Sequence, residues 1–185
     1  MIAFEGFHGT SKAASENILK TAFLRSTKKD EWLGHGIYFF VDGISSPDLN
    51  ADHWAKCNSR DSVAGIQKYN DYAILKSDIN VDEDFLLDIT TIEGLKRFNI
   101  AKEFFFNKMI ENFDFHKKAE HNCILFNYFV KMLKSQAVKH NLYIKNKRER
   151  IAGLRLNVPN TTVLCVINAA SIGHTQIVKE GKVNE

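Results

Sequence analysis

Long apolar runs are absent from this sequence of 185 residues. Its apolar runs are short, such as Cys123–Phe126, and a membrane-spanning helix needs roughly 18 residues or more. The first residues carry neither a basic head nor a small-residue cleavage site, so we expect no secretory signal. With 44% hydrophobic and 25% charged residues, the composition is that of one soluble domain over residues 1–185. We therefore expect a cytoplasmic protein that does not use a membrane as a partner.

Cysteine is also scarce. The three cysteines, Cys57, Cys123 and Cys165, lie 66 and 42 residues apart, which excludes a paired-cysteine metal site and gives no disulfide framework. The sequence has no Walker loop, no dinucleotide-fold glycine pattern and no zinc-binding helix signature. We therefore expect no metal. The net charge of +3 is too small to indicate a nucleic-acid partner by itself.

Strand patterns lie at both ends of the chain, and helical patterns lie in the middle. A polar start, Ser45–Asp48, with a proline in the first turn predicts a helix that carries Trp54. Phe-rich amphipathic patterns predict a helical region at about 90–136. This order predicts an α+β fold and not a doubly wound parallel sheet. Short runs of β-forming residues predict strands over 2–7, 37–41, 72–75, 85–89, 142–144, 151–156 and 163–167.

Three segments of the first 60 residues combine aromatic, histidine and glycine residues. His8-Gly9-Thr10 follows the first predicted strand as a turn, and Gly9 leaves room for a ligand to approach the backbone. Two aromatics, Tyr38 after a glycine pair and Trp54 on the predicted helix, could enclose a flat ring. Each segment has a structural alternative, because a single histidine is often only hydrogen-bonded, glycines make turns and Tyr38 could belong to the core.

Together and in this order, the segments resemble ADP-ribosyltransferases of the poly-ADP-ribose polymerase and diphtheria-toxin clade, which are named for a His-Tyr-Glu triad. The family resemblance implies split antiparallel β-sheets flanked by helices, with the helical region as an insertion. The matching segments are His8-Gly9-Thr10, Phe23-Leu24-Arg25-Ser26, Trp32-Leu33-Gly34-His35-Gly36-Ile37-Tyr38-Phe39-Phe40, Ala51-Asp52-His53-Trp54-Ala55, Phe85 to Thr90, and Val163 to Ile172.

The resemblance implies a role for each matching residue. His8 would hold the adenosine ribose of NAD, and the backbone of Gly9 would bind the nicotinamide carboxamide. Tyr38 would stack on the nicotinamide ring, with Trp54 as the candidate for its opposite face. Arg25 would lie near the adenosine or pyrophosphate, which suits a guanidinium. The implied NAD-binding set is His8, Gly9, Thr10, Arg25, Gly36, Tyr38 and Trp54.

The third residue of the triad is not matched. Where the family has a glutamate that stabilises the developing oxocarbenium ion, this sequence has Val163, preceded by two threonines. Three explanations stay open: the alignment is displaced by a few residues, Glu149 supplies the carboxylate, or the acceptor supplies the nucleophile. Glu149 lies among basic neighbours and could simply pair with them. It completes the candidate catalytic set with His8 and Tyr38.

Basic residues cluster late in the chain. Residues 139–155 hold six Lys and Arg against one acid, whereas residues 76–97 hold six acids against three bases. The basic run could be a solvated surface or a site that attracts a phosphate backbone. It lies just before residues 157–162, which the family comparison makes the acceptor-facing loop.

The resemblance predicts a mono-ADP-ribosyltransferase that consumes NAD and modifies a macromolecule, with RNA or DNA favoured over protein. By analogy with compact bacterial relatives, it would be a toxin or an anti-phage effector with an antitoxin as a partner. Two alternatives stay open. One is a catalytically silent module that binds NAD, ADP-ribose or RNA. The other is an NAD glycohydrolase that uses water as the acceptor.

Overall fold

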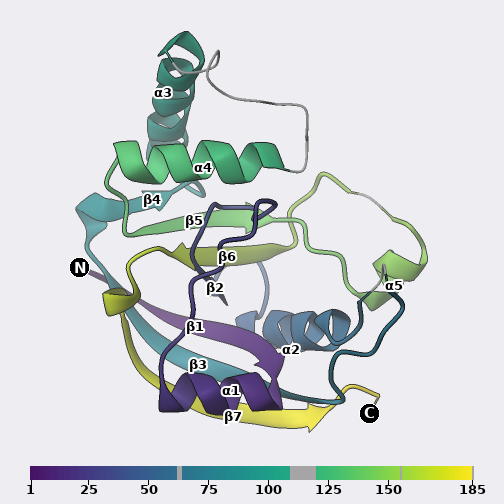
Figure 1. The fold of residues 1–185 in the computed structure, drawn as a ribbon. Coiled ribbons are helices and arrows are strands. Elements are labelled where there is room, and N and C mark those ends of the chain that lie inside the picture. The colour runs from purple at the N-terminus through teal and green to yellow at the C-terminus, as the bar shows by residue number, and fades with distance from the viewer. Residues whose placement is uncertain (62–63, 109–119, 155, 185) are drawn as a thin grey trace.

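The computed structural model describes residues 1–61, 64–108, 120–154 and 156–184, and these form an α+β fold (Figure 1). Within them, seven strands make one mixed sheet in the order β4-β5-β6-β2-β1-β3-β7, which confirms the predicted class. The strands are β1 (Ile2–Ser11), β2 (Ile37–Phe40), β3 (Asp71–Val81), β4 (Leu86–Asp88), β5 (Ala137–Leu142), β6 (Thr161–Val166) and β7 (Ile172–Lys182). The helices are α1 (Lys12–Lys20), α2 (Pro47–Asn58), α3 (Ile92–Lys108), α4 (His121–Met132) and α5 (Lys147–Ile151).

The neighbouring strands β1 and β2, in the middle of the sheet, have the fewest paired residues. β1 pairs with β3 along its whole length, and β2 pairs with β6 at every residue. Between β1 and β2, Phe7 and Phe40 form the one paired position. In Figure 1, β5 and β6 accordingly lie to one side of this junction, and β1, β3 and β7 lie to the other. The two strands diverge beyond that pair, which leaves room between them.

Alternate strand residues contribute to two apolar clusters. Phe40 and Val163 belong to one cluster, into which α2 packs Ala51 and Ala55. Phe39 and Leu164 belong to the other, against which Phe23 packs. This separation follows from the period of two along a strand, which sends neighbouring side chains to opposite faces. The cavity described below opens beside the first cluster.

Among the described residues, the predicted helical region at 90–136 holds the helices α3 and α4. Phe105 of α3 and Phe129 of α4 are fully buried, and the ring of Phe98 lies edge-on to Phe129 with centroids 5.0 Å apart. The amphipathic pattern therefore predicted these helices correctly. Met109 and Phe113, which extend the pattern, lie outside the described residues. No helix of the described ranges has the length and apolar character needed to cross a membrane.

The first predicted strand was too short. The sequence places a turn at His8-Gly9-Thr10, but β1 continues through these residues to Ser11, whose hydroxyl then caps α1. Gly9 does not interrupt the strand because it lies directly under α2, where the backbone of Ala51 leaves no room for a side chain. The glycine is therefore required by the packing of a helix on the strand.

The predicted strands after residue 140 need larger corrections. No strand forms over the described part of 151–156, because α5 and a turn with Gly153 at φ +67° occupy this segment. β5 begins at Ala137 and ends where the sequence predicted a strand to begin. β7 was not predicted, because it is an edge strand whose side chains are largely exposed. β4 and β5 pair in parallel, so the sheet is not wholly antiparallel.

Candidate functional site

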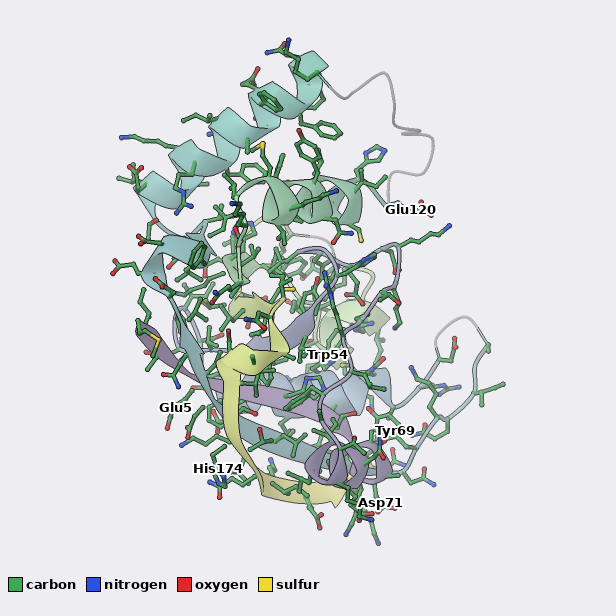
Figure 2. All side chains as sticks on the ribbon, turned by 60° about the vertical axis from the view of Figure 1, so that its left-hand side comes forward. Glu5, Trp54, Tyr69, Asp71, Glu120 and His174 are labelled. Carbon is green, nitrogen blue, oxygen red and sulfur yellow. The ribbon has the colours of Figure 1, made fainter. Side chains whose placement is uncertain are left out.

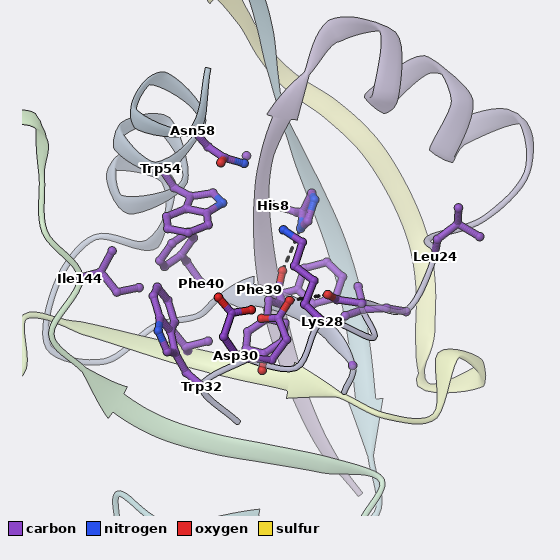
Figure 3. A pocket seen from close by; sticks show the side chains of 17 residues that line it. His8, Leu24, Lys28, Asp30, Trp32, Phe39, Phe40, Trp54, Asn58 and Ile144 are labelled. Atoms are coloured by element: carbon purple, nitrogen blue, oxygen red, sulfur yellow. Dashed lines mark hydrogen bonds between the residues drawn. The ribbon is translucent and has the colours of Figure 1, made fainter. Parts of the chain in front are cut away.

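A cavity of about 290 Å³ lies where β1 and β2 diverge (Figure 3). β1 contributes His8 and Gly9, and β2 with its approach contributes Gly36 to Phe40. Trp54 and Asn58 of α2 form one wall, and the loop before β2 contributes further residues. The volume is at the lower end of the usual range for small-molecule sites, about 300–1,000 Å³. Segments far apart in the sequence therefore build one pocket.

Five of the eight predicted site residues line this cavity: His8, Gly9, Gly36, Tyr38 and Trp54. Val163, which the resemblance puts at the position of a family glutamate, lines it as well and is buried. Thr10, Arg25 and Glu149 are not among its lining residues.

His8 is held in one tautomer. Its Nδ1 lies 2.8 Å from the carbonyl oxygen of Tyr38, and because a carbonyl can only accept, Nδ1 donates. Burial lowers the pKa of His8 below 6.5, and the bond to Tyr38 opposes this only in part. The ring is therefore neutral at pH 7, with the lone pair of Nε2 left to accept a hydrogen bond. The hydrogen bond from His8 to Tyr38 also joins β1 to β2, whose backbones pair at one position.

Tyr38 uses its hydroxyl within the protein. The hydroxyl accepts from the backbone N–H of Leu33 at 2.9 Å and donates to the carbonyl of Gly34 at 2.7 Å. Burial raises the pKa of Tyr38 far above its usual value. The hydroxyl is thus unsuited to proton transfer at neutral pH. What Tyr38 offers to a ligand is its ring.

The wall opposite His8 is aromatic. The rings of Trp32 and Trp54 meet edge-on with centroids 5.6 Å apart, and Figure 3 shows them beside Phe40 and Ile144. All four side chains line the cavity. The ring of His8 itself packs edge-on against Phe23 and Phe39. An apolar wall in the same cavity as a histidine suits a ligand that has a flat ring and hydroxyl groups.

Both predicted binding glycines have packing reasons to be glycine. A side chain at Gly36 would meet the thiol of Cys165, and its Cβ would lie 2.9 Å from the carbonyl oxygen of Val166. Gly9 is constrained by α2 as described above. Each glycine also borders the cavity. These two glycines therefore let α2 and β6 pack closely on the strands beside them, in addition to any room that they leave for a ligand.

The three predicted residues outside the cavity have structural partners. The Nε of Arg25 donates to the carbonyl of His35 at 3.0 Å. Thr10 pairs with Ala73 in the β1–β3 ladder. Glu149 forms a capping box at the start of α5, where its carboxylate accepts from the backbone N–H of Asn146 at 2.8 Å. The structure thus gives the Glu149 carboxylate a local helix-capping role.

Sequence reasoning missed charged residues on the loop before β2. Lys28, Asp30 and Glu31 all line the cavity, and Figure 3 shows Lys28 and Asp30 in front of it. Glu31 accepts a hydrogen bond from the hydroxyl of Ser26. Their place in the sequence could have indicated them, because the acidic pair Asp30-Glu31 directly precedes the Trp-Leu-Gly segment of the proposed site.

A second cavity of about 180 Å³ adjoins the first. The two share Phe40, Trp54 and Ile144 as lining residues. The rest of its lining is polar and comes from α2, from the segment before α5 and from the start of β6: Asn50, His53, Lys145, Asn146, Asn160 and Thr161. The three asparagine amides of this lining already bond within the protein, for example both ends of the Asn160 amide to the backbone of Ile144. Lys145 adds one cation beside the aromatic wall.

Cysteine and metal chemistry find little support near the cavity. Cys165 lies behind Gly36, and burial raises its pKa to about 12, so its thiol stays protonated at neutral pH. The three cysteines form no disulfide. Among the described residues, no group of three or more His, Cys, Asp or Glu side chains is arranged to hold a metal ion.

Comparisons with known proteins leave the function open. No protein-family model matches the chain. It is similar to "Uncharacterized protein MJ0359" of Methanocaldococcus jannaschii, with 27% identity over 88 residues. The match covers 47% of this chain and 37% of that protein, so this chain spans little more than a third of its relative's length.

Proposed function

We propose that this chain is an NAD-dependent mono-ADP-ribosyltransferase with an ADP-ribosyltransferase-like fold, in which the cavity between β1 and β2 binds the nicotinamide–ribose half of NAD. The observation that carries the proposal is that His8, Gly36, Tyr38 and Trp54, singled out on three separate segments, line one cavity. A histidine lone pair, an aromatic wall and strand backbone are the groups that a nicotinamide riboside needs. The cavity's volume suits this half of NAD, with the adenosine half extending outward.

The charged lining suggests a revised binding set. Lys28, and not Arg25, is the cation among the lining residues, so we assign it to the pyrophosphate. Nε2 of His8 would accept from a ribose hydroxyl, and Trp54 would face the nicotinamide ring. Thr10 has no place in this set because it does not line the cavity.

The reaction is a substitution at C1′ of the nicotinamide ribose. The bond from C1′ to the nicotinamide nitrogen breaks, and its electron pair leaves with nicotinamide, which becomes neutral. A lone pair of the acceptor forms the new bond to C1′, and the acceptor loses its proton to a base or to water. The enzyme's contribution is to hold the reacting atoms together and to stabilise the cation that develops on the ribose.

We place the acceptor at the second cavity, which shares the aromatic wall with the first. Lys145 of its lining could contact a phosphate. The basic residues of α5 follow directly. These features favour RNA or DNA over protein as the acceptor.

One observation favours a second function, a silent module that binds NAD or RNA. Val163 lines the cavity where the family has its glutamate, and a valine cannot stabilise a cation. A silent module would bind NAD without releasing nicotinamide. A glycohydrolase, in contrast, would release nicotinamide with water as the sole acceptor.

The test uses NAD labelled in its adenylate part, incubated with the protein and with separate pools of RNA, DNA and protein. We expect label in a nucleic-acid pool, nicotinamide in equal amount, and loss of both in the His8→Ala and Tyr38→Ala variants. Label that persists in both variants would overturn the site. Binding of NAD without nicotinamide release from any mixture would support the silent module.

A role as a bacterial toxin or anti-phage effector, with an antitoxin, follows from the same proposal. Induced expression of the wild type should arrest growth, and Tyr38→Ala should relieve the arrest. Arrest that persists in the variant at equal soluble expression would contradict a toxin that acts through this cavity.

A further inference from the structure

The chemistry at C1′ calls for a carboxylate, because a positive charge develops on the ribose as nicotinamide leaves. The residue of β6 that lines the cavity is Val163, which has no carboxylate. The carboxylate of Glu149 caps α5 and is not among the lining residues. Two carboxylates remain among the cavity's lining residues, Asp30 and Glu31. Both lie on the loop that enters β2, on a different element from the family's glutamate.

The backbone before β2 fixes Glu31 beside the cavity. The N–H of Ser26 donates to the carbonyl of Gly36 at 2.9 Å, so this loop is joined to the first residue before β2. The hydroxyl of Ser26 in turn donates to the carboxylate of Glu31. Cys123 anchors the other part of the loop, with its thiol 3.4 Å from the carbonyl of Lys28. The carboxylate of Glu31 is therefore oriented through Ser26, which is hydrogen-bonded to Gly36, the cavity-lining residue just before β2.

Glu31 is better placed than its neighbour. Its side chain is half-buried, whereas Asp30 is exposed. The negative charge of Glu31 lies close enough to contribute to raising the pKa of Tyr38, which lines the cavity, and of Cys165, which lies behind Gly36. Asp30 lies farther toward solvent, where water screens its charge.

We propose that Glu31, and not a residue of β6, is the catalytic carboxylate of this site, an inference that rests on the proposed function. Its carboxylate accepts a hydrogen bond from a hydroxyl of the nicotinamide ribose and stabilises the cation at C1′. As the acceptor's lone pair forms its bond to C1′, Glu31 takes up the acceptor's proton and then releases it to water. Ser26 is a positioning residue, because it acts through Glu31.

The test compares Glu31→Gln with Asp30→Asn and Ser26→Ala. A glutamine oxygen can still accept from Ser26, so Glu31→Gln removes the charge and keeps the loop contact. We expect Glu31→Gln to lower kcat for nicotinamide release by about 10²–10³-fold, with NAD affinity by calorimetry changed less than threefold. Asp30→Asn should change kcat less than threefold. Ser26→Ala should give an intermediate loss.

Three failing outcomes are distinguishable. Wild-type protein that binds no NAD, or releases no nicotinamide, refutes the proposed function itself. Wild-type activity with Glu31→Gln as active as Asp30→Asn refutes the role of Glu31 alone. A Glu31→Gln variant that loses NAD binding and kcat together, with a lower melting temperature, would show that Glu31 is structural.

Discussion

Replacement of Gly9 by alanine separates the two reasons for this glycine. An added methyl group would lie 2.9 Å from the carbonyl carbon of Ala51, closer still to its oxygen, and 3.1 Å from the Cβ of Ala55. Ordinary contact begins at 3.4 Å, and the oxygen of Ala51 is the nearest obstacle, so α2 must move away from β1 by about an ångström or more. The obstacle is backbone, which cannot rotate aside. Overpacking of this kind costs about 1–3 kcal/mol.

For a chain of this length, that cost corresponds to a fall of roughly 3–10 °C in melting temperature. The same shift would displace Trp54 and Asn58, which α2 contributes to the cavity, so NAD affinity should fall as well. Gly173→Ala is the matched control, because its methyl group would meet nothing closer than 3.4 Å. If Gly9→Ala weakened NAD binding with an unchanged melting temperature, Gly9 would act through ligand approach and the packing argument would be refuted.

Three further perturbations test the site and its support. Tyr38→Phe keeps the ring but leaves the buried N–H of Leu33 without its acceptor, so urea titration should show a loss of about 1–3 kcal/mol. Burial lowers the pKa of His8 and of His140, so their contribution to stability is present above pH 6.5 and is lost as the pH falls. His8→Gln should flatten the dependence of the free energy of unfolding on pH between pH 7 and 5. An unchanged slope of this dependence would contradict a buried neutral His8. Burial would raise the pKa of Asp52, but its bonds to two lysines and a tyrosine outweigh burial and lower it, so its contribution is lost as the pH falls below about 4. Asp52→Asn should destabilise the protein by about 2–3 kcal/mol at pH 7, and a loss that persists unchanged at pH 3 would contradict this account.

Local patterns predicted the elements that face the core. The continuous apolar run at Ile37 to Phe40 is buried on both faces, and Phe105 and Phe129 mark the inner faces of their helices. The hydrophobic pattern failed to predict segments whose secondary structure depends on strand pairing or on helix capping. β7 carries few buried residues and is held by its ladder to β3. α5 begins because Asn146 and Glu149 cap it, although the residues after it resemble a strand.

The candidate site was predictable in part for the same reason. His8, Tyr38 and Trp54 lie on or beside regular elements, and their order in the chain resembles the pattern that suggested the site. Glu31 lies on an irregular loop, and the bond from Ser26, the bridge to Gly36 and the contact of Cys123 with Lys28 hold this loop at the cavity. Contacts of this kind depend on tertiary structure, which spacing along the sequence does not encode.

The most direct test of the account is a calorimetric titration of the purified wild-type protein with NAD, repeated with Trp54→Ala and with Gly173→Ala as a distant control. The account predicts one site per chain, at least tenfold weaker binding in Trp54→Ala because one face of the nicotinamide pocket is lost, and wild-type binding in Gly173→Ala. Absence of heat with the wild type, or equal affinity in all three proteins, would contradict the claim that NAD binds between β1 and β2.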